Sequence, residues 1–293
     1  ILIATTVRLL LLYVATRLSY ATGADLSVDI YRRTLYQDYS IHTSRHSSEI
    51  INGIIIKTNT VIGQILVPLL NLISSVVIML GIISIIFTIN AQVALITFSV
   101  FTLLYWIISF STKKTLQKNS QLIANESTQM IKSLQEGLGG IRDVLIDGTQ
   151  EFYCNLYQNS DLSLRKASGD NIFIGSSPRY LMEAIGMILI AILAYYLTFQ
   201  EDGVVVAIPV LGALAIGAQK LLPALQQAYH SYSAIKGAKS SFIDVLDLLN
   251  QPLSYNANQD LINLMPFKQG ITFKDVSFRY TKDTPWILKN VNL

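Results

Sequence analysis

Two residues of opposite charge, Arg179 and Glu183, lie four positions apart where an apolar segment begins. At this spacing both side chains lie on one face of an α-helix, where they can form an ion pair. Ionisable residues inside a membrane segment are candidates for function, here for lining the path of a substrate. Near a membrane surface such a pair can equally be structural, because long side chains reach toward water. Both interpretations stay open for Arg179 and Glu183.

Arg8 is a further candidate because it interrupts an apolar run at the start of the sequence. The planar guanidinium group suits phosphate, so Arg8 could line a path for a phosphate-bearing lipid. We favour the alternative, in which Arg8 lies near the outer end of a membrane helix and its side chain reaches out to water.

The other residues with reactive side chains form no recognisable site. His42, His46 and His230 are not grouped with cysteine or carboxylates at the spacing of metal ligands. Cys154 is the one cysteine, so no intrachain disulfide is possible and we interpret it as an inert thiol. We predict neither a metal site nor a catalytic residue in this chain.

The elements around these residues belong to a membrane protein. From Thr58 to Thr112 the chain has no acidic or basic residue and no histidine. About 20 apolar residues cross a ~30 Å hydrocarbon core as a helix, so this stretch suffices for two crossings and a turn. Charged residues make up only 14% of the chain, and a net charge of +3 does not indicate a nucleic-acid partner. Five apolar spans are predicted, at about 1–16, 61–87, 91–110, 180–199 and 204–223.

The long connections between these spans carry most of the basic residues, which predicts that they face the cytosol. We therefore expect a multi-pass protein of the cell (inner) membrane, with its long loops and C-terminus in the cytoplasm. Apolar residues at helical spacing predict that the helices continue into the cytosol. A single helix over 91–145 would be roughly 80 Å long, and a second helix would return from about Glu151.

The C-terminal part changes character. Residues 250–269, with prolines and several asparagines, are typical of a linker. Alternation predicts a strand over 270–280, and a change of phase near Lys274–Asp275 suggests a bulge. A second strand is predicted over 287–293.

The segments Ile271–Tyr280 and Trp286–Leu293 resemble the opening of the nucleotide-binding domain of ABC transporters. The membrane part resembles the exporter-type transmembrane domain of that superfamily, in which six helices extend far into the cytosol. The expected fold is therefore an all-α membrane bundle of long helices, five of the six present, followed by the first β-strands of the nucleotide-binding domain. The implied domains are a transmembrane domain at 1–249, a linker at 250–269 and the start of the nucleotide-binding domain at 270–293.

This resemblance implies that the full-length protein uses ATP and Mg²⁺. We expect the chain to lack the first helix and the Walker A and B motifs, so that it does not hydrolyse ATP alone. Tyr280 matches the aromatic residue that stacks on adenine in the family, face against face. The alternative is a tyrosine that merely covers a strand edge, and the preceding residues favour the adenine role.

The resemblance also implies two short coupling helices that contact the nucleotide-binding domains, at roughly 39–46 and 146–154. The alternative is a pair of solvated helix–helix turns. The residues predicted to couple are Tyr39 and His42 in the first helix, and Asp147, Glu151, Phe152 and Tyr153 in the second.

A closer resemblance, to the lipid-linked oligosaccharide flippases and polysaccharide exporters, lies in Ser177–Gly186, Leu221–Leu225 and Ser231–Ser233. It implies a half-transporter that works as a homodimer, or with a paralogous partner, and exports or flips an amphiphile such as a lipid-linked sugar, glycolipid or polysaccharide precursor. Alternatives are a peptide or hydrophobic-drug exporter, a channel or secondary transporter, and a catalytically degenerate scaffold subunit. A secondary transporter would show internal repeats, and we find no convincing repeat.

Overall fold

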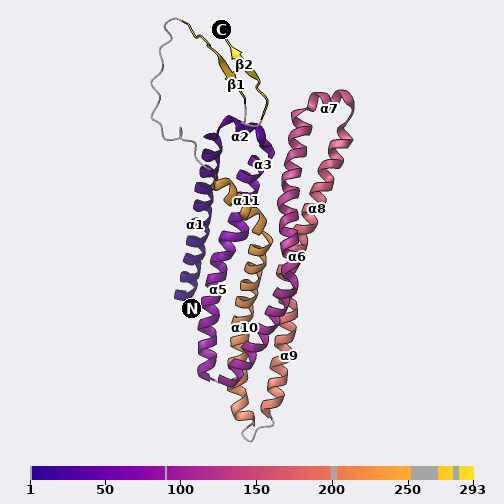
Figure 1. Cartoon of the computed structure of the whole chain (residues 1–293). Coiled ribbons are helices and arrows are strands. Elements are labelled where there is room, and N and C mark those ends of the chain that lie inside the picture. The colour runs from indigo at the N-terminus through magenta and orange to yellow at the C-terminus, as the bar shows by residue number, and fades with distance from the viewer. Residues whose placement is uncertain (1, 90, 199–202, 252–269, 280–283) are drawn as a thin grey trace.

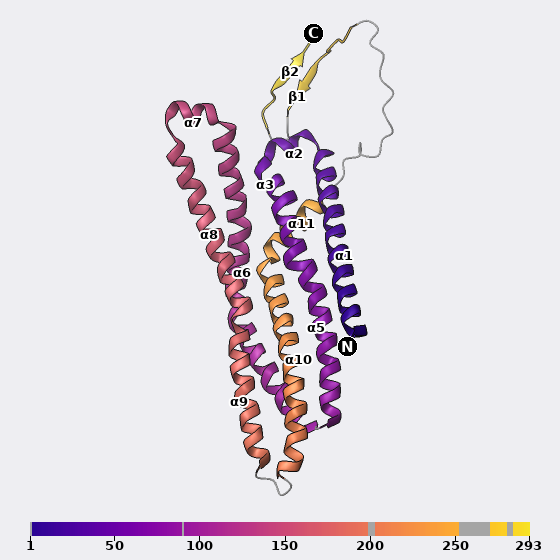
Figure 2. The same cartoon turned by 180° about the vertical axis from the view of Figure 1, so that it is seen from behind.

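The protein is a bundle of long helices with a small β-hairpin beyond one end, as Figures 1 and 2 show from opposite sides. This arrangement confirms the predicted fold class. The computed structural model describes residues 2–89, 91–198, 203–251, 270–279 and 284–293.

Six long helices make up most of the bundle and lie lengthwise beside one another in both views. The longest, α6, has 49 residues and is therefore about 74 Å long, more than twice the ~30 Å hydrocarbon core. Much of the bundle therefore projects beyond any membrane that it crosses. The long helices are α1 (Leu2–Leu35), α5 (Val67–Ile89), α6 (Ala91–Gly139), α8 (Gln150–Ser176), α9 (Pro178–Thr198) and α10 (Gly203–Gly237).

Shorter elements connect these helices. Two of them are π-helical turns, η1 and η2, in which one extra residue is accommodated within a helix. They interrupt a helix that otherwise continues from α3 through α4 into α5. The short elements are α2 (Tyr39–Ser44), α3 (Ser47–Asn52), η1 (Gly53–Lys57), α4 (Thr58–Val61), η2 (Ile62–Leu66), α7 (Ile141–Asp147) and α11 (Lys239–Leu249).

One helical stretch within the described residues, Ser47–Thr88, is long enough and apolar enough to cross a membrane. It contains the predicted span at 61–87. The other four predicted spans each include residues whose side chains the structure does not describe, and they stay predictions. They lie along α1, α6, α9 and α10.

Two apolar clusters hold the helices together at different levels. Between α6, α9 and α10 the buried side chains are Phe101, Met182 and Leu221. Between α1, the α4–η2 segment and α11 with its N-cap the buried residues are Ile30, Val61, Ile65, Ala238 and Val245. In both views α10 lies in the middle of the bundle, beside α5 on one side and α9 on the other.

Helices α6 and α8 form an arm that carries α7 at its tip, apart from the tip that carries α2 (Figure 1). The predicted single helix over 91–145 is wrong at its end, because α6 stops at Gly139 and α7 starts at Ile141. The short helix α7 therefore begins before the range 146–154 in which the second coupling helix was expected. Most of that range lies in the turn after α7 and in the start of α8. Gly148 ends α7 with a φ of 65°, where its N–H donates to the Val144 carbonyl. This left-handed conformation favours glycine.

The hairpin consists of β1 (Val276–Phe278) and β2 (Leu288–Val291), so both strands are shorter than predicted. They pair in antiparallel fashion, as consecutive strands joined by a short connection commonly do.

The predicted bulge near Lys274–Asp275 is wrong in position. The pairing is irregular between Val276 and Phe278, where β2 contains one residue more than β1. The φ of Asn290 in β2 is 52°. Asp275 also has a positive φ, 50°, directly before β1, so the change of phase in the sequence reflects a real backbone irregularity there.

Candidate functional site

Two adjoining cavities between the long helices present polar side chains to the bundle interior. The first, the Arg179 cavity, has a volume of about 440 Å³ and lies between α6, the α8–α9 junction and α10. The second, the Asn171 cavity, has a volume of about 250 Å³ and lies between α4–η2, α8 and α10. Gly175 and His230 border both cavities. We therefore treat the two cavities as one site and call it the polar tract.

The predicted pair of Arg179 and Glu183 is present at the entrance of α9. Nε of Arg179 donates to Oε1 of Glu183 at 2.9 Å, and Nε2 of Gln226 on α10 donates to the same oxygen at 3.4 Å. The Arg179 side chain remains 61% exposed. Because Glu183 takes the Nε hydrogen, the terminal guanidinium nitrogens can bind another acceptor.

Aromatic side chains of α6 and α10 also line the Arg179 cavity. The rings of Tyr105 on α6 and Tyr229 on α10 lie 5.5 Å apart between centroids. The hydroxyl groups of Tyr229 and Thr112 share a hydrogen bond of 3.2 Å. The wall is therefore apolar over its ring faces and polar at its hydroxyl groups.

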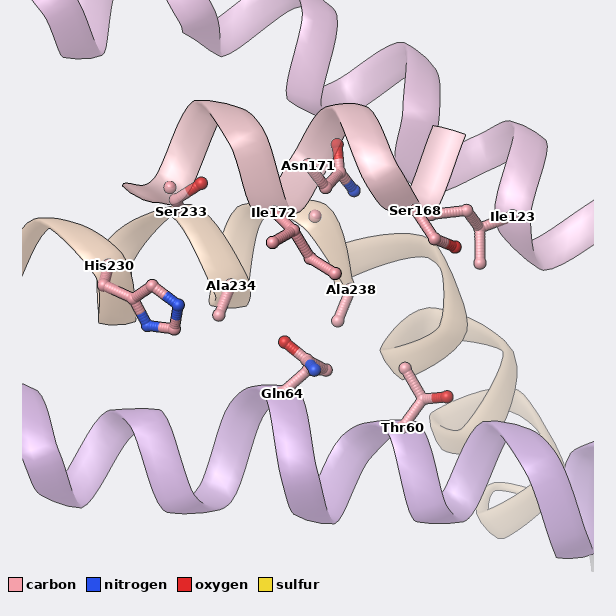
Figure 3. Close-up of a pocket in the computed structure, with 12 residues that line it drawn as sticks. Thr60, Gln64, Ile123, Ser168, Asn171, Ile172, His230, Ser233, Ala234 and Ala238 are labelled. Atoms are coloured by element: carbon pink, nitrogen blue, oxygen red, sulfur yellow. The ribbon is translucent and has the colours of Figure 1, made fainter. Parts of the chain in front are cut away.

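Both polar and apolar side chains line the Asn171 cavity. Figure 3 shows Thr60 and Gln64 on one side, facing Ala234 on α10 and Ala238 at the start of α11 across the cavity. None of the described residues that line it is an aspartate, glutamate, lysine or arginine. The polar side chains that line it are Thr60, Gln64, Ser168, Asn171, His230 and Ser233.

Close contact between α8 and α10 shapes this cavity. A Cβ atom at Gly237 would lie 2.7 Å from Nδ2 of Asn171, so a side chain there would displace the Asn171 amide. Oδ1 of Asn171 accepts a hydrogen bond of 2.9 Å from Asn119 on α6. Ser233 is only 2% exposed, and its Oγ has no hydrogen-bond partner among the described residues. Buried polar groups usually have a partner, so this hydroxyl can serve a ligand or water.

Sequence reasoning missed the α10 side of the tract, although a signal existed. His230, Ser233, Ala234, Gly237 and Ala238 recur at three- and four-residue steps, which places them on one face of a helix. Small and polar residues on such a face favour close packing or a cavity rather than contact with lipid.

The residues predicted to couple lie at the two ends that carry short helices. Tyr39 begins α2 and is 71% exposed, while His42 in the same helix is half-buried. Asp147 ends α7, and Glu151 and Phe152 are exposed in the first turn of α8.

Tyr153 differs from these residues because it is half-buried against the arm. A Cβ atom at Gly137 on α6 would lie 3.3 Å from its Cδ1. Its ring also meets that of Phe152 edge to face, with centroids 5.3 Å apart. Tyr153 therefore helps to join α6 to α8, whereas Phe152 projects into solvent.

Two predicted site residues cannot be placed beside the others. Arg8 lies in α1, but its side chain is outside the description. Tyr280 lies outside the described residues altogether. Their predicted roles stay predictions.

Comparison with known proteins identifies the family. The solved structure of a bacterial Atm1-family ABC exporter with ATP bound superposes with a TM-score of 0.69 at 15% sequence identity. The match covers 94% of this chain and 48% of the exporter chain, so the chain spans about half of that protein's length. No curated protein sequence matches. The family model of the ABC transporter transmembrane region matches residues 1–203. The chain therefore belongs to the ABC transporter transmembrane-region family, and it adopts the fold of an ABC exporter.

Proposed function

We propose that the full-length protein is an ATP-driven exporter that moves an amphiphilic substrate through the membrane by alternating access. Two copies, or one copy with a paralogous half-transporter, would enclose the substrate between their helices. ATP and Mg²⁺ would bind to the nucleotide-binding domains and draw them together. The observation that carries this proposal is the pair of short helices, α2 and α7, at the ends of helices much longer than a membrane is thick.

The α7 tip has the surface that a coupling role requires. Leu145 and Ile146 are 61% and 70% exposed, and Phe152 directly after the turn is 62% exposed. Apolar side chains gathered on a surface outside the membrane mark a contact site for another protein surface. At this tip the partner would be a nucleotide-binding domain, and Tyr39 on α2 would make the corresponding contact at the other tip. The superposition on an exporter with ATP bound supports this assignment.

The polar tract is the proposed place of substrate contact. An arginine with free guanidinium nitrogens lies beside a cavity lined by neutral hydrogen-bonding groups. The first feature suits phosphate and the second suits hydroxyl groups. A lipid-linked sugar, glycolipid or polysaccharide precursor carries both groups on an apolar anchor. This combination favours such a substrate over a hydrophobic drug, which would leave the polar groups of the tract without partners.

The test is ATP hydrolysis by the full-length protein in liposomes, with lipid-linked sugars, glycolipids, peptides and hydrophobic drugs added in separate reactions. We expect stimulation by the sugar-bearing lipids, together with their ATP-dependent movement between leaflets. Stimulation only by peptides or drugs would refute the substrate class. Movement of a substrate without ATP would indicate a channel or secondary transporter, and absence of ATP binding would indicate a degenerate subunit.

A further inference from the structure

Helix α11 is the last described element before residue 252, so it lies between the membrane bundle and everything that follows in the chain. It begins directly after α10, where the helix breaks at Gly237 and Ala238. An unsupported helix of 11 residues has little stability of its own in water. Its surroundings must therefore hold it in place.

The start of α11 is capped by another helix. Ala238, at the N-cap position, has no side chain that can accept a hydrogen bond. Oγ of Ser120 on α6, which is only 1% exposed, instead accepts a hydrogen bond of 2.8 Å from the Ser240 N–H. One of the free N–H groups at the helix start is thus satisfied by α6.

The middle of α11 is joined to the α3–α5 helix by an ion pair. Nζ of Lys57 lies 2.5 Å from Oδ2 of Asp244, and the Lys57 side chain is only 11% exposed. Lys57 belongs to the π-helical turn η1. Replacing Asp244 would leave the largely buried Lys57 charge without this partner, which is destabilising. The Asp244 side chain is 39% exposed and stays partly solvated when Lys57 is replaced.

The end of α11 is held by contacts to η1 and α1. A Cβ atom at Gly53 would overlap Cδ1 of Leu248 and lie 3.7 Å from its Cγ, so the Leu248 side chain packs directly over Gly53. The Gln251 side chain accepts a hydrogen bond of 2.5 Å from Nε2 of Gln37, and its carbonyl accepts one of 3.2 Å from Arg33. Gln251 itself is only 5% exposed.

The inner face of α11 completes these contacts with an apolar surface. Val245 is 1% exposed and belongs to the cluster that includes Ile30 on α1 and Val61 on α4. We call the whole set of contacts the α11 dock. It joins α11 to three separate parts of the bundle: α1, the α3–α5 helix and α6.

We propose that the α11 dock is a third mechanical connection between the nucleotide-binding domain and the membrane bundle, made within one chain, and that Lys57 is its positioning residue. α2 and α7 present surfaces to a domain, whereas the dock fixes the place on the bundle from which the rest of the chain continues. Because α11 is docked on α1, the α3–α5 helix and α6, a pull on the chain beyond Gln251 acts on all three. This inference rests on the proposed ATP-driven export.

The first test compares charge variants of the full-length protein in liposomes. Lys57→Gln and Asp244→Asn should lower the amount of substrate moved per ATP hydrolysed by about 2- to 30-fold. The exchanged pair, Lys57→Asp with Asp244→Lys, should recover most of this ratio. Arg165→Gln, which removes an exposed ion pair to Asp161 on α8, should leave the ratio unchanged. A purely structural effect would lower the amount of folded protein but not the ratio.

The second test keeps the inference falsifiable if those variants fold poorly. Gly53→Cys with Leu248→Cys, in a Cys154→Ser background, should form a disulfide with equal yield with and without a non-hydrolysable ATP analogue. The cross-linked protein should still transport. Loss of transport that returns on reduction would overturn the inference, because α11 would then have to undock. Failure of the unaltered protein to couple ATP to transport would refute the proposed function, whereas cross-linking yield reports on the dock alone.

Discussion

Gly23 on α1 faces Ile62 of the π-helical turn η2 so closely that a methyl group does not fit. A Cβ atom at Gly23 would overlap Cδ1 of Ile62 and lie 2.5 Å from its Cγ1. Ile62 is 5% exposed and cannot move into solvent. Alanine normally stabilises a helix interior by about 0.5–1 kcal/mol relative to glycine. Overpacking costs about 1–3 kcal/mol, so we expect Gly23→Ala to lower the free energy of unfolding by about 1 kcal/mol.

Gly63 provides the matched control one residue further along the partner helix. No atom lies within 4 Å of a Cβ atom built there. Gly63→Ala should therefore raise the free energy of unfolding through the higher helix propensity of alanine, without overpacking. The assay is thermal unfolding in detergent at a fixed scan rate, because unfolding of such a protein is usually irreversible. The apparent Tm should fall by roughly 3 °C for Gly23→Ala and rise slightly for Gly63→Ala.

A double variant tests the cause of this effect. Ile62→Ala removes both overlapping atoms and leaves Cβ of residue 62 at 3.8 Å from the new methyl group, an ordinary contact. Gly23→Ala with Ile62→Ala should therefore be less destabilised than the sum of the single variants by about 1 kcal/mol. If Gly23→Ala is as stable as Gly63→Ala, the close packing of α1 on η2 is refuted.

Three further predictions concern the tract, the α7 tip and the nucleotide. Arg179→Gln should raise the concentration of anionic substrate that half-maximally stimulates ATP hydrolysis, whereas Arg165→Gln should leave it unchanged. If both variants raise this concentration equally, Arg179 does not contact the substrate. Gly148→Ala, at a φ of 65°, should speed hydrogen exchange in α7 more than Gly139→Ala, as mass spectrometry can measure. In the full-length protein Tyr280→Ala should raise the KM for ATP by about tenfold, because it removes a stacking ring, while Tyr280→Phe should leave this KM unchanged. If the two variants have similar KM values for ATP, Tyr280 does not stack on adenine.

The sequence allowed the helical fold to be predicted because its apolar runs and its helical spacing are local signals. The same is true of the pair of Arg179 and Glu183, whose spacing alone places both side chains on one helix face. The end of α6 was misplaced because three nearby glycines, Gly137, Gly139 and Gly140, allow a break at any of them. Tertiary packing decides which one ends the helix.

The Asn171 cavity and the α11 dock could not be predicted in the same way. Asn119 and Asn171 are 52 residues apart, and Lys57 and Asp244 are 187 apart. Neither polar pair produces a local pattern in the sequence, because whether its two residues meet depends on which helices become neighbours. Lys57 also lies at the edge of the charge-free stretch, where a lysine is expected to reach for water rather than for a partner in another helix.

The two π-helical turns affect how this protein tolerates changes in length. An additional residue in a regular α-helix rotates everything beyond it by about 100°. In η1 and η2 an additional residue is absorbed within a single widened turn, so α5 keeps the same side toward α10. A relative can therefore lose the extra residue at 53–57 or 62–66 while the rest of its helix keeps the same orientation. Gaps in an evolutionary alignment belong inside this helix as well as in loops.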